Sequence, residues 1–148
     1  MADITDSATR SRMMGAIKGK NTLPELSVRR ALNAKGFRYR LHDKSLPGKP
    51  DIVLPKWNAA IFVHGCFWHM HGCANSTIPS TRRDFWLEKL NSNVVRDEKH
   101  IKQLLSDGWR VAVVWECSIR KELISDDMVH FAKLADWLER GTSLSFET

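Results

Sequence analysis

The chain has 148 residues, of which 43% are hydrophobic and 27% are charged, and its formal net charge is +6. This length and composition are typical of one globular domain, and they exclude a disordered tail or a multidomain assembly. No apolar run approaches the ~18 residues of a membrane-spanning helix, and the first residues lack the basic-then-apolar order of a signal peptide, so we expect a cytoplasmic protein with no membrane partner.

The basic excess lies in the N-terminal third of the chain. Residues 1–50 carry 11 basic and 4 acidic side chains, whereas residues 51–148 carry 12 and 13. Concentrated positive charge on an otherwise balanced domain favours a polyanion as the partner, usually nucleic acid, and a well-solvated surface is the alternative. Residues 1–20 hold few apolar side chains, so we expect a basic arm that contacts the nucleic acid.

A helix is expected directly after this arm, over residues 22–36. Thr22 followed three positions later by Glu25 is a capping box, in which the side chain of each accepts a hydrogen bond from the backbone N–H of the other. Gly36 is a typical C-terminal stop.

Three short strands are expected next, at residues 37–42, 51–54 and 59–64. The first alternates apolar and polar residues, and the other two are continuous apolar runs. Because the three follow one another closely, they should pair in an antiparallel or mixed sheet.

The second half adds a long helix at residues 81–106, a strand at 109–115 and a final helix at 128–138. The element order is therefore α-β-β-β-α-β-α. This order predicts an α/β sandwich around a central mixed sheet, in a single domain that spans residues 1–148.

Four metal-ligating side chains form the first candidate site. Cys66, His71 and Cys73 fall within eight residues, and Cys117 follows the strand at 109–115. If this strand and the one before Cys66 are neighbours in the sheet, their C-terminal ends bring the four side chains together. Three thiolates and one imidazole make a closed tetrahedral site for one structural zinc ion per chain. The alternative is that Cys117 is an ordinary buried thiol and the loop cysteines are incidental.

Asp51 is the centre of a second candidate site. It begins an apolar strand after a Pro/Gly loop, and we expect His64, His69 and Glu25 near it. Oxygen ligands suit a hard cation such as Mg²⁺, which polarises a phosphoryl oxygen while an imidazole accepts a proton from water. Together these residues describe a metal-dependent phosphodiesterase. Singly, each has a structural explanation, such as the capping role of Glu25 or support of a zinc ligand by a histidine.

Aromatic side chains form a third candidate feature. Phe67 and Trp68 lie in the loop that zinc would order. Trp86 shares one face of the long helix with Lys89 and Asn93, at spacings of three and seven residues. Such a surface can insert between base steps and read base edges, and core packing is the alternative for the aromatic residues.

At these residues the chain resembles the very-short-patch repair (Vsr) endonucleases of bacteria. The resemblance covers nearly the whole chain, and the run from His64 to Cys73 is highly specific. That family is similar in fold to type II restriction endonucleases, whose core order α-β-β-β-α-β agrees with the order expected here. The segments that carry the resemblance are residues 8–14, 46–51, 62–73, 82–89 and 108–117.

The resemblance also implies an activity. Members of the family nick DNA on the 5′ side of the T in a T·G mismatch, which arises by deamination of 5-methylcytosine in a CC(A/T)GG-type methylation site. The nick starts short-patch resynthesis. The implied partner is therefore double-stranded DNA that carries a T·G mismatch, with a MutL-type mismatch-repair protein as a further candidate. We expect the protein to act as a monomer.

Specific roles follow from the resemblance. Asp51 is the implied catalytic ligand of Mg²⁺ and His69 the general base, with Glu25 assisting through water. His64 is a further active-site residue. The strand at this site lacks the second acidic residue and the lysine of the wider endonuclease pattern, so the main-chain carbonyl of Val63 is the implied second metal contact. The implied DNA contacts are Met14, which approaches from the other groove, an intercalating wedge of Phe67, Trp68 and Trp86, and the base-contacting Lys89 and Asn93.

Two other functions fit the same residues. A non-catalytic, zinc-stabilised DNA-binding module needs the basic arm and the aromatic residues but not Asp51. A restriction endonuclease cuts both strands of unmismatched sites. One acidic centre in a chain of this size favours the nick in a single strand, unless the protein dimerises.

Overall fold

The first helix begins at the predicted cap in the computed structural model, which describes residues 22–125 and 128–148. α2 (Leu23–Ala34) follows Thr22, whose hydroxyl accepts a hydrogen bond from the backbone N–H of Glu25 at 3.3 Å. This contact satisfies one of the N–H groups that a helix leaves unpaired at its start. The expected basic arm, residues 1–20, lies outside the described residues.

Five strands form one mixed sheet in the order β1-β2-β3-β4-β5. The pairings of β1 with β2 and of β2 with β3 are antiparallel, and those of β3 with β4 and of β4 with β5 are parallel. The mixed sheet is therefore confirmed, as is the neighbourhood of the strands that precede Cys66 and Cys117. The strands are β1 (Arg40–Leu41), β2 (Ile52–Leu54), β3 (Ala59–His64), β4 (Arg110–Trp115) and β5 (Ser145–Glu147).

The two edge strands differ from the prediction. The strand expected at residues 37–42 is reduced to the two residues of β1, because Phe37 turns into the core and meets Trp57, with ring centroids 5.7 Å apart. β5 was not predicted from its three residues. It exists because β4 is buried along almost its whole length, and a buried parallel strand needs hydrogen-bonding partners on both edges.

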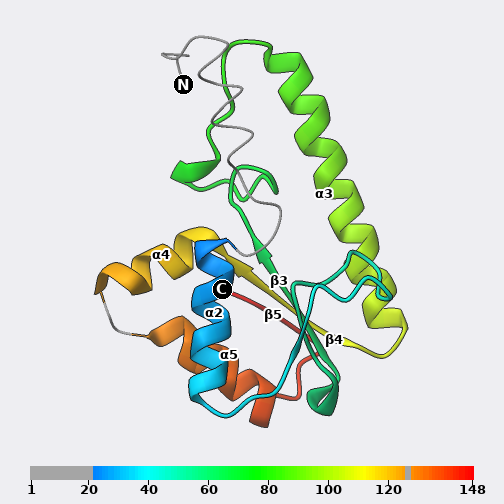
Figure 1. Ribbon diagram of the computed structural model, residues 1–148. Helices are drawn as coiled ribbons and strands as arrows, with labels where there is room; N and C mark the ends of the chain where they lie inside the picture. The colour runs from blue at the N-terminus through cyan, green and yellow to red at the C-terminus, as the bar shows by residue number, and fades with distance from the viewer. Residues whose placement is uncertain (1–21, 126–127) are drawn as a thin grey trace.

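Helices cover both faces of the sheet (Figure 1). α2 is grouped with α4 (Glu116–Ser125) and α5 (Val129–Arg140) on one face, and α3 (Arg83–Ser106) lies on the other. α4 was missed because it starts directly after β4, with no turn residues to separate the two elements. None of the helices in the two described ranges is long and apolar enough to cross a membrane.

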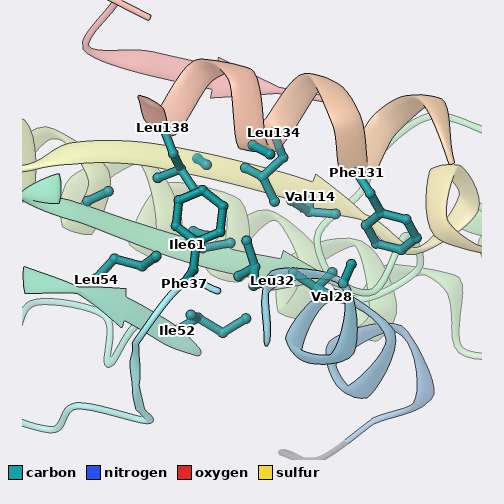
Figure 2. Packing of buried hydrophobic residues seen from close by; sticks show 14 of the residues in the cluster. Val28, Leu32, Phe37, Ile52, Leu54, Ile61, Val114, Phe131, Leu134 and Leu138 are labelled. Carbon is teal, nitrogen blue, oxygen red and sulfur yellow. The ribbon is translucent and has the colours of Figure 1, made fainter. Parts of the chain in front are cut away.

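The core occupies both faces because side chains alternate along the central strands. Ile61 of β3 and Val114 of β4 point into the larger cluster, among side chains of α2 and α5 such as Leu32 and Leu134 (Figure 2). Their neighbour Phe62 points to the opposite face and packs with Leu104 of α3. The architecture is thus a mixed α/β sandwich that is compatible with a restriction-endonuclease-like fold.

Arg110 fastens the end of α5 to the sheet. Its guanidinium donates hydrogen bonds to the carbonyls of Leu138 at 3.2 Å and Gly141 at 3.0 Å, and it lies 4.2 Å from the centroid of the Trp137 ring. A cation at this position satisfies carbonyls that a helix leaves unpaired at its C-terminus.

We expect Arg110→Ala to lower the free energy of unfolding by about 3 kcal/mol, because hydrogen bonds to a charged group contribute roughly 1.5–3 kcal/mol each. Urea denaturation of the variant measures the loss. Arg140→Ala is the matched control, since the Arg140 side chain is 81% exposed and its ion pair with Asp136 is long, at 3.7 Å. That variant should lose less than about 1 kcal/mol. Equal losses in both variants would contradict the role given to Arg110.

Candidate functional site

The sheet brings the predicted acidic centre together in a groove of about 750 Å³. Because β2 runs antiparallel to β3, Asp51 at the start of β2 lies beside the end of β3. Val63 and His64 come from that end, and His69 comes from the loop that follows. These four residues line the groove with residues of α3.

Asp51 is held by the backbone of β3. The N–H of Val63 donates to Oδ2 of Asp51 at 2.8 Å. Burial raises the pKa of Asp51 to about 6, and the charge of Glu25 adds to this rise while the hydrogen bond from Val63 opposes it. A bound cation would favour the ionised carboxylate. The N–H and carbonyl of one strand residue point to the same side, so the carbonyl of Val63 also faces Asp51.

The two predicted histidines lie face to face. The ring centroids of His64 and His69 are 3.8 Å apart and the rings are nearly parallel, at 3°. Burial lowers the pKa of His64 to about 3, with the charge of His69 as a second cause, so the His64 imidazole is neutral near pH 7.

Asp97 of α3 is a site residue that the sequence interpretation missed. Its Oδ2 shares a hydrogen bond with Nδ1 of His69. Burial by itself would raise the pKa of Asp97, but the hydrogen bond to His69 and the neighbouring charges lower it below the ordinary value. One signal was present in the sequence. Asp97 is seven residues from both Leu90 and Leu104, which are buried, so it is an acidic residue on the apolar stripe of a helix.

His42 is a second missed residue. Its Nε2 is hydrogen-bonded to Oε1 of Glu25, which also accepts from Arg29 at 2.7 Å. Glu25 is only 2% exposed, whereas His42 lines the groove. The predicted carboxylate of Glu25 therefore meets the groove through the imidazole of His42. Nothing in the spacing of the sequence indicated this contact, because it joins α2 to the end of β1.

Two carboxylate and imidazole clusters thus meet at the groove, one of them with Glu25 buried behind its wall. Glu25, His42 and Asp51 offer ligand atoms that all lie within 4.8 Å of one another, and His64, His69 and Asp97 do the same. Carboxylate oxygens are suitable ligands for a hard cation such as Mg²⁺, so in these clusters Asp51 and the other carboxylates, and not the imidazoles, are the groups that suit it. The residues present therefore fit the metal that the resemblance implies.

The four predicted zinc ligands also converge. Cys66 follows β3, His71 and Cys73 lie in the next loop, and Cys117 lies in the first turn of α4. Their ligand atoms all lie within 4.8 Å of one another, with Nδ1 of His71 3.6 Å from Sγ of Cys66 and 3.4 Å from Sγ of Cys117. The parallel pairing of β3 with β4 produces this convergence. Three thiols and an imidazole in this arrangement match the donor set of a structural zinc site.

Ring contacts of Trp115 join the cysteine and histidine cluster to the groove. His71 lies against one face of Trp115, with centroids 4.1 Å apart and planes at 8°. The ring of Trp115 meets His64 at 5.2 Å, and its Nε1 donates to Glu147 of β5 at 2.8 Å. The C-terminal strand therefore fixes the indole between a cysteine and histidine cluster and the groove.

The aromatic residues form a cluster of their own near the start of α3. The ring centroid of Phe67 is 5.0 Å from that of Trp68 and 5.5 Å from that of Trp86, and the two indoles are 5.9 Å apart. All three side chains are half-buried, and the neighbouring Phe85 is 45% exposed. The cluster thus presents apolar surface to solvent beside the loop that carries His69.

Asn93 does not share the exposed face expected for it. Lys89 is exposed, but Asn93 is 6% exposed, and its Nδ2 donates to the carbonyl of Trp68 at 3.1 Å. Its Oδ1 accepts from Arg96. The amide therefore holds the loop that carries Trp68. Met14 lies outside the described residues.

Comparison of this chain with known proteins identifies its family. The family model described as DNA mismatch endonuclease Vsr matches residues 2–75. The DNA mismatch endonuclease Vsr of Escherichia coli (strain K12) is 43% identical over 150 residues, which cover 100% of this chain and 96% of the relative. The chain belongs to the Vsr family of DNA mismatch endonucleases. The resemblance seen in the sequence is therefore confirmed, as is the prediction of an endonuclease.

Two further relatives of this chain are named as nicking enzymes. The type II nicking enzyme V.XorIIP of Xanthomonas oryzae is 46% identical over 119 residues, or 80% of this chain and 88% of the relative. The type II nicking enzyme V.NmeAIP of Neisseria meningitidis is 47% identical over 124 residues, or 84% of this chain and 89% of the relative. Each of these names describes an enzyme that cuts a nucleic-acid strand.

Proposed function

We propose that the protein is a Mg²⁺-dependent endonuclease that nicks DNA on the 5′ side of the T in a T·G mismatch and so starts very short patch repair. The observation that carries this proposal is the groove, in which Asp51 lies beside the His69 and Asp97 pair. The nicking and mismatch enzymes among the relatives support the same chemistry. We further propose that it acts as a monomer, because one acidic centre serves one strand.

In this proposal, Asp51 and the Val63 carbonyl hold the cation. These two oxygens would hold Mg²⁺, whose charge would supply polarisation of a phosphoryl oxygen and easier ionisation of a water. Asp97 accepts a hydrogen bond from the Nδ1–H of His69, which leaves the lone pair of Nε2 in that ring free to accept the proton of the attacking water. The neutral His64 supports the plane of His69 by stacking, and Glu25 acts through His42.

The other predicted residues have supporting roles in the same proposal. Cys66, His71, Cys73 and Cys117 hold one structural zinc ion, which orders the loop between β3 and α3. The half-buried Phe67, Trp68 and Trp86 form the wedge that enters the base stack, at a cost that is lowest at a weakened base pair. Lys89, Asn93 and Met14 contribute DNA contacts, with Asn93 bound to the wedge loop.

The decisive experiment uses duplexes that carry T·G, C·G or T·A at one position, with each strand labelled separately, in the presence of Mg²⁺. The proposal expects one cut, in the T strand of the T·G duplex. Binding without any cut would favour the non-catalytic DNA-binding module. Cuts in both strands of the C·G duplex would favour a restriction endonuclease.

Asp97→Asn should slow nicking by about 10²-fold, because general acid and base groups contribute roughly 10²–10⁴ and the amide no longer fixes the proton on Nδ1 of His69. Single-turnover rates at saturating DNA measure the effect. Asp84→Asn changes an exposed carboxylate in the first turn of the same helix and serves as the control. A nicking rate for Asp97→Asn within twofold of the control would contradict the role of the pair.

A further inference from the structure

The groove has a cationic end that the proposed chemistry does not use. Lys44 and Lys49 lie on the loop before Asp51, and Arg96 and His100 lie on α3. All four line the same groove as Asp51 and the histidines. We call these four residues the cationic rim.

The two walls of the cationic rim are locked together. A Cβ atom added at Gly48 would lie 2.9 Å from Cβ of His100, so the loop backbone rests directly against the helix. Leu46 of the loop packs into the cluster that contains Ile101 and Leu105 of α3. The spacing between loop and helix is therefore set by packing, before any ligand arrives.

The backbone at Lys49 is unusual. Its φ is 48°, in the left-handed region, although a residue before proline normally adopts an extended conformation. A residue other than glycine held there costs on the order of 1 kcal/mol, and such strain gathers at ligand sites. Glycine would adopt this conformation without strain, so the chain carries a lysine at the edge of the groove at a cost in backbone energy.

The charge of Arg96 acts on Asp97, whereas the two lysines are the charges of the cationic rim that remain for a ligand. Lys44 and Lys49 are exposed, and among the described residues no ion pair includes either lysine or His100. Asp97, the acidic residue on this stretch of α3 that lines the groove, is bonded to His69. An anion is therefore the ligand that this end of the groove favours.

We propose that the cationic rim is a subsite for a second backbone phosphate of the strand to be cut, next to the scissile phosphate. The inference rests on the proposed function, because the scissile phosphate is the group at Asp51. The subsite recognises the charge and position of a phosphodiester and is indifferent to the base. It fixes where along the strand the reacting phosphate stops.

The test compares two pairs of charge-removing substitutions. Lys44→Gln with Lys49→Asn removes two rim charges, and asparagine is chosen because it tolerates the left-handed backbone. Lys102→Gln with Lys133→Gln removes two exposed charges elsewhere on α3 and α5. Binding of the labelled T·G and C·G duplexes without Mg²⁺ is measured over a range of salt concentrations, and nicking is measured at saturating DNA with Mg²⁺.

The double variant of Lys44 and Lys49, the rim pair, should bind both duplexes more weakly by the same factor, about tenfold at moderate salt. The dependence of log K on log salt should become shallower by roughly 0.9 for each lost contact. The nicking rate of the rim pair at saturating DNA should also fall, by up to about tenfold, because the reacting phosphate is less well placed when the neighbouring phosphate is no longer held. The control pair should change neither quantity. A rim pair that behaves like the control pair overturns the subsite.

A second measurement locates the phosphate. In duplexes with one uncharged methylphosphonate at successive positions around the cut, the unmodified protein should lose affinity at a position adjacent to the scissile phosphate. The rim pair should lose nothing further at that position, because the two changes remove the same contact. Additive losses at every position overturn the subsite. If the unmodified protein nicks none of the duplexes, the proposed function itself has failed, whatever the rim variants do.

Discussion

Replacing Asp51 by asparagine should abolish nicking while leaving binding of the T·G duplex intact. The amide cannot supply the anionic oxygen that holds the cation, and loss of metal-assisted charge stabilisation removes several kcal/mol from the transition state, a fall in rate of at least about 10³-fold. Quantified nicking and a gel-shift assay on the same duplex separate the two effects. Asp136→Asn, at a carboxylate 64% exposed on α5, is the control. Unchanged nicking in Asp51→Asn would remove Asp51 from the catalytic machinery.

The same variant should be more stable than the natural protein when no divalent cation is present. The pKa of Asp51 is about 6 in the folded protein, above the ordinary value of 3.8 for an aspartate, so the folded state resists ionisation. The buried Asp51 carboxylate therefore destabilises the folded state when it is ionised. This effect is absent below pH 4, grows between pH 4 and pH 6 and is complete above pH 6. Asparagine removes it, with a gain of up to about 3 kcal/mol at pH 7. Denaturation at pH 4 and pH 7, with and without Mg²⁺, measures the gain, which Mg²⁺ should reverse.

Loss of the zinc ligands should have the largest effect on stability. Elemental analysis of the purified protein should give about one zinc per chain, and His71→Ala should reduce this content to near zero. Because a structural zinc site contributes on the order of 10 kcal/mol of binding free energy to folding, the variant should lose at least about 5 kcal/mol of unfolding free energy. A zinc-free natural protein would reject the site.

His130→Ala is the matched control for this prediction, because His130 is a half-buried histidine on α5 outside the cluster. It should keep its zinc. Burial raises the pKa of the Cys66 thiol to about 12 in the absence of metal. Zinc binding must therefore displace protons from the cysteines, and the affinity for zinc should fall as the pH is lowered.

Local patterns in the sequence were sufficient for the parts of the fold that local chemistry determines. The cap at Thr22 and the apolar run of β3 need no distant partner to be recognised. The convergence of the four metal ligands was expected on the condition that the strands before Cys66 and Cys117 are neighbours, and β3 does pair with β4. The short β5 could not, because its three residues are ordered by the edge of β4 and not by their own propensity.

The same distinction between local pattern and distant contact applies to the candidate site. Asp51 and the histidines were predictable because they lie at strand ends or in the loop after a strand. The missed residues, Asp97 and His42, act through contacts between elements that are 28 and 17 positions apart in the sequence. Asn93 shows a further limit, since helical spacing placed it beside Lys89 but not beneath the loop that covers it.

The indole of Trp115 has a practical consequence. It stacks on a predicted zinc ligand, His71, and meets a groove histidine, His64, edge to face. Its emission is therefore a built-in optical reporter of both neighbourhoods, and the stacked imidazole should quench it differently once a metal engages His71. Because one ring contacts both histidines, a change in the position of His71 should also alter the packing around His64.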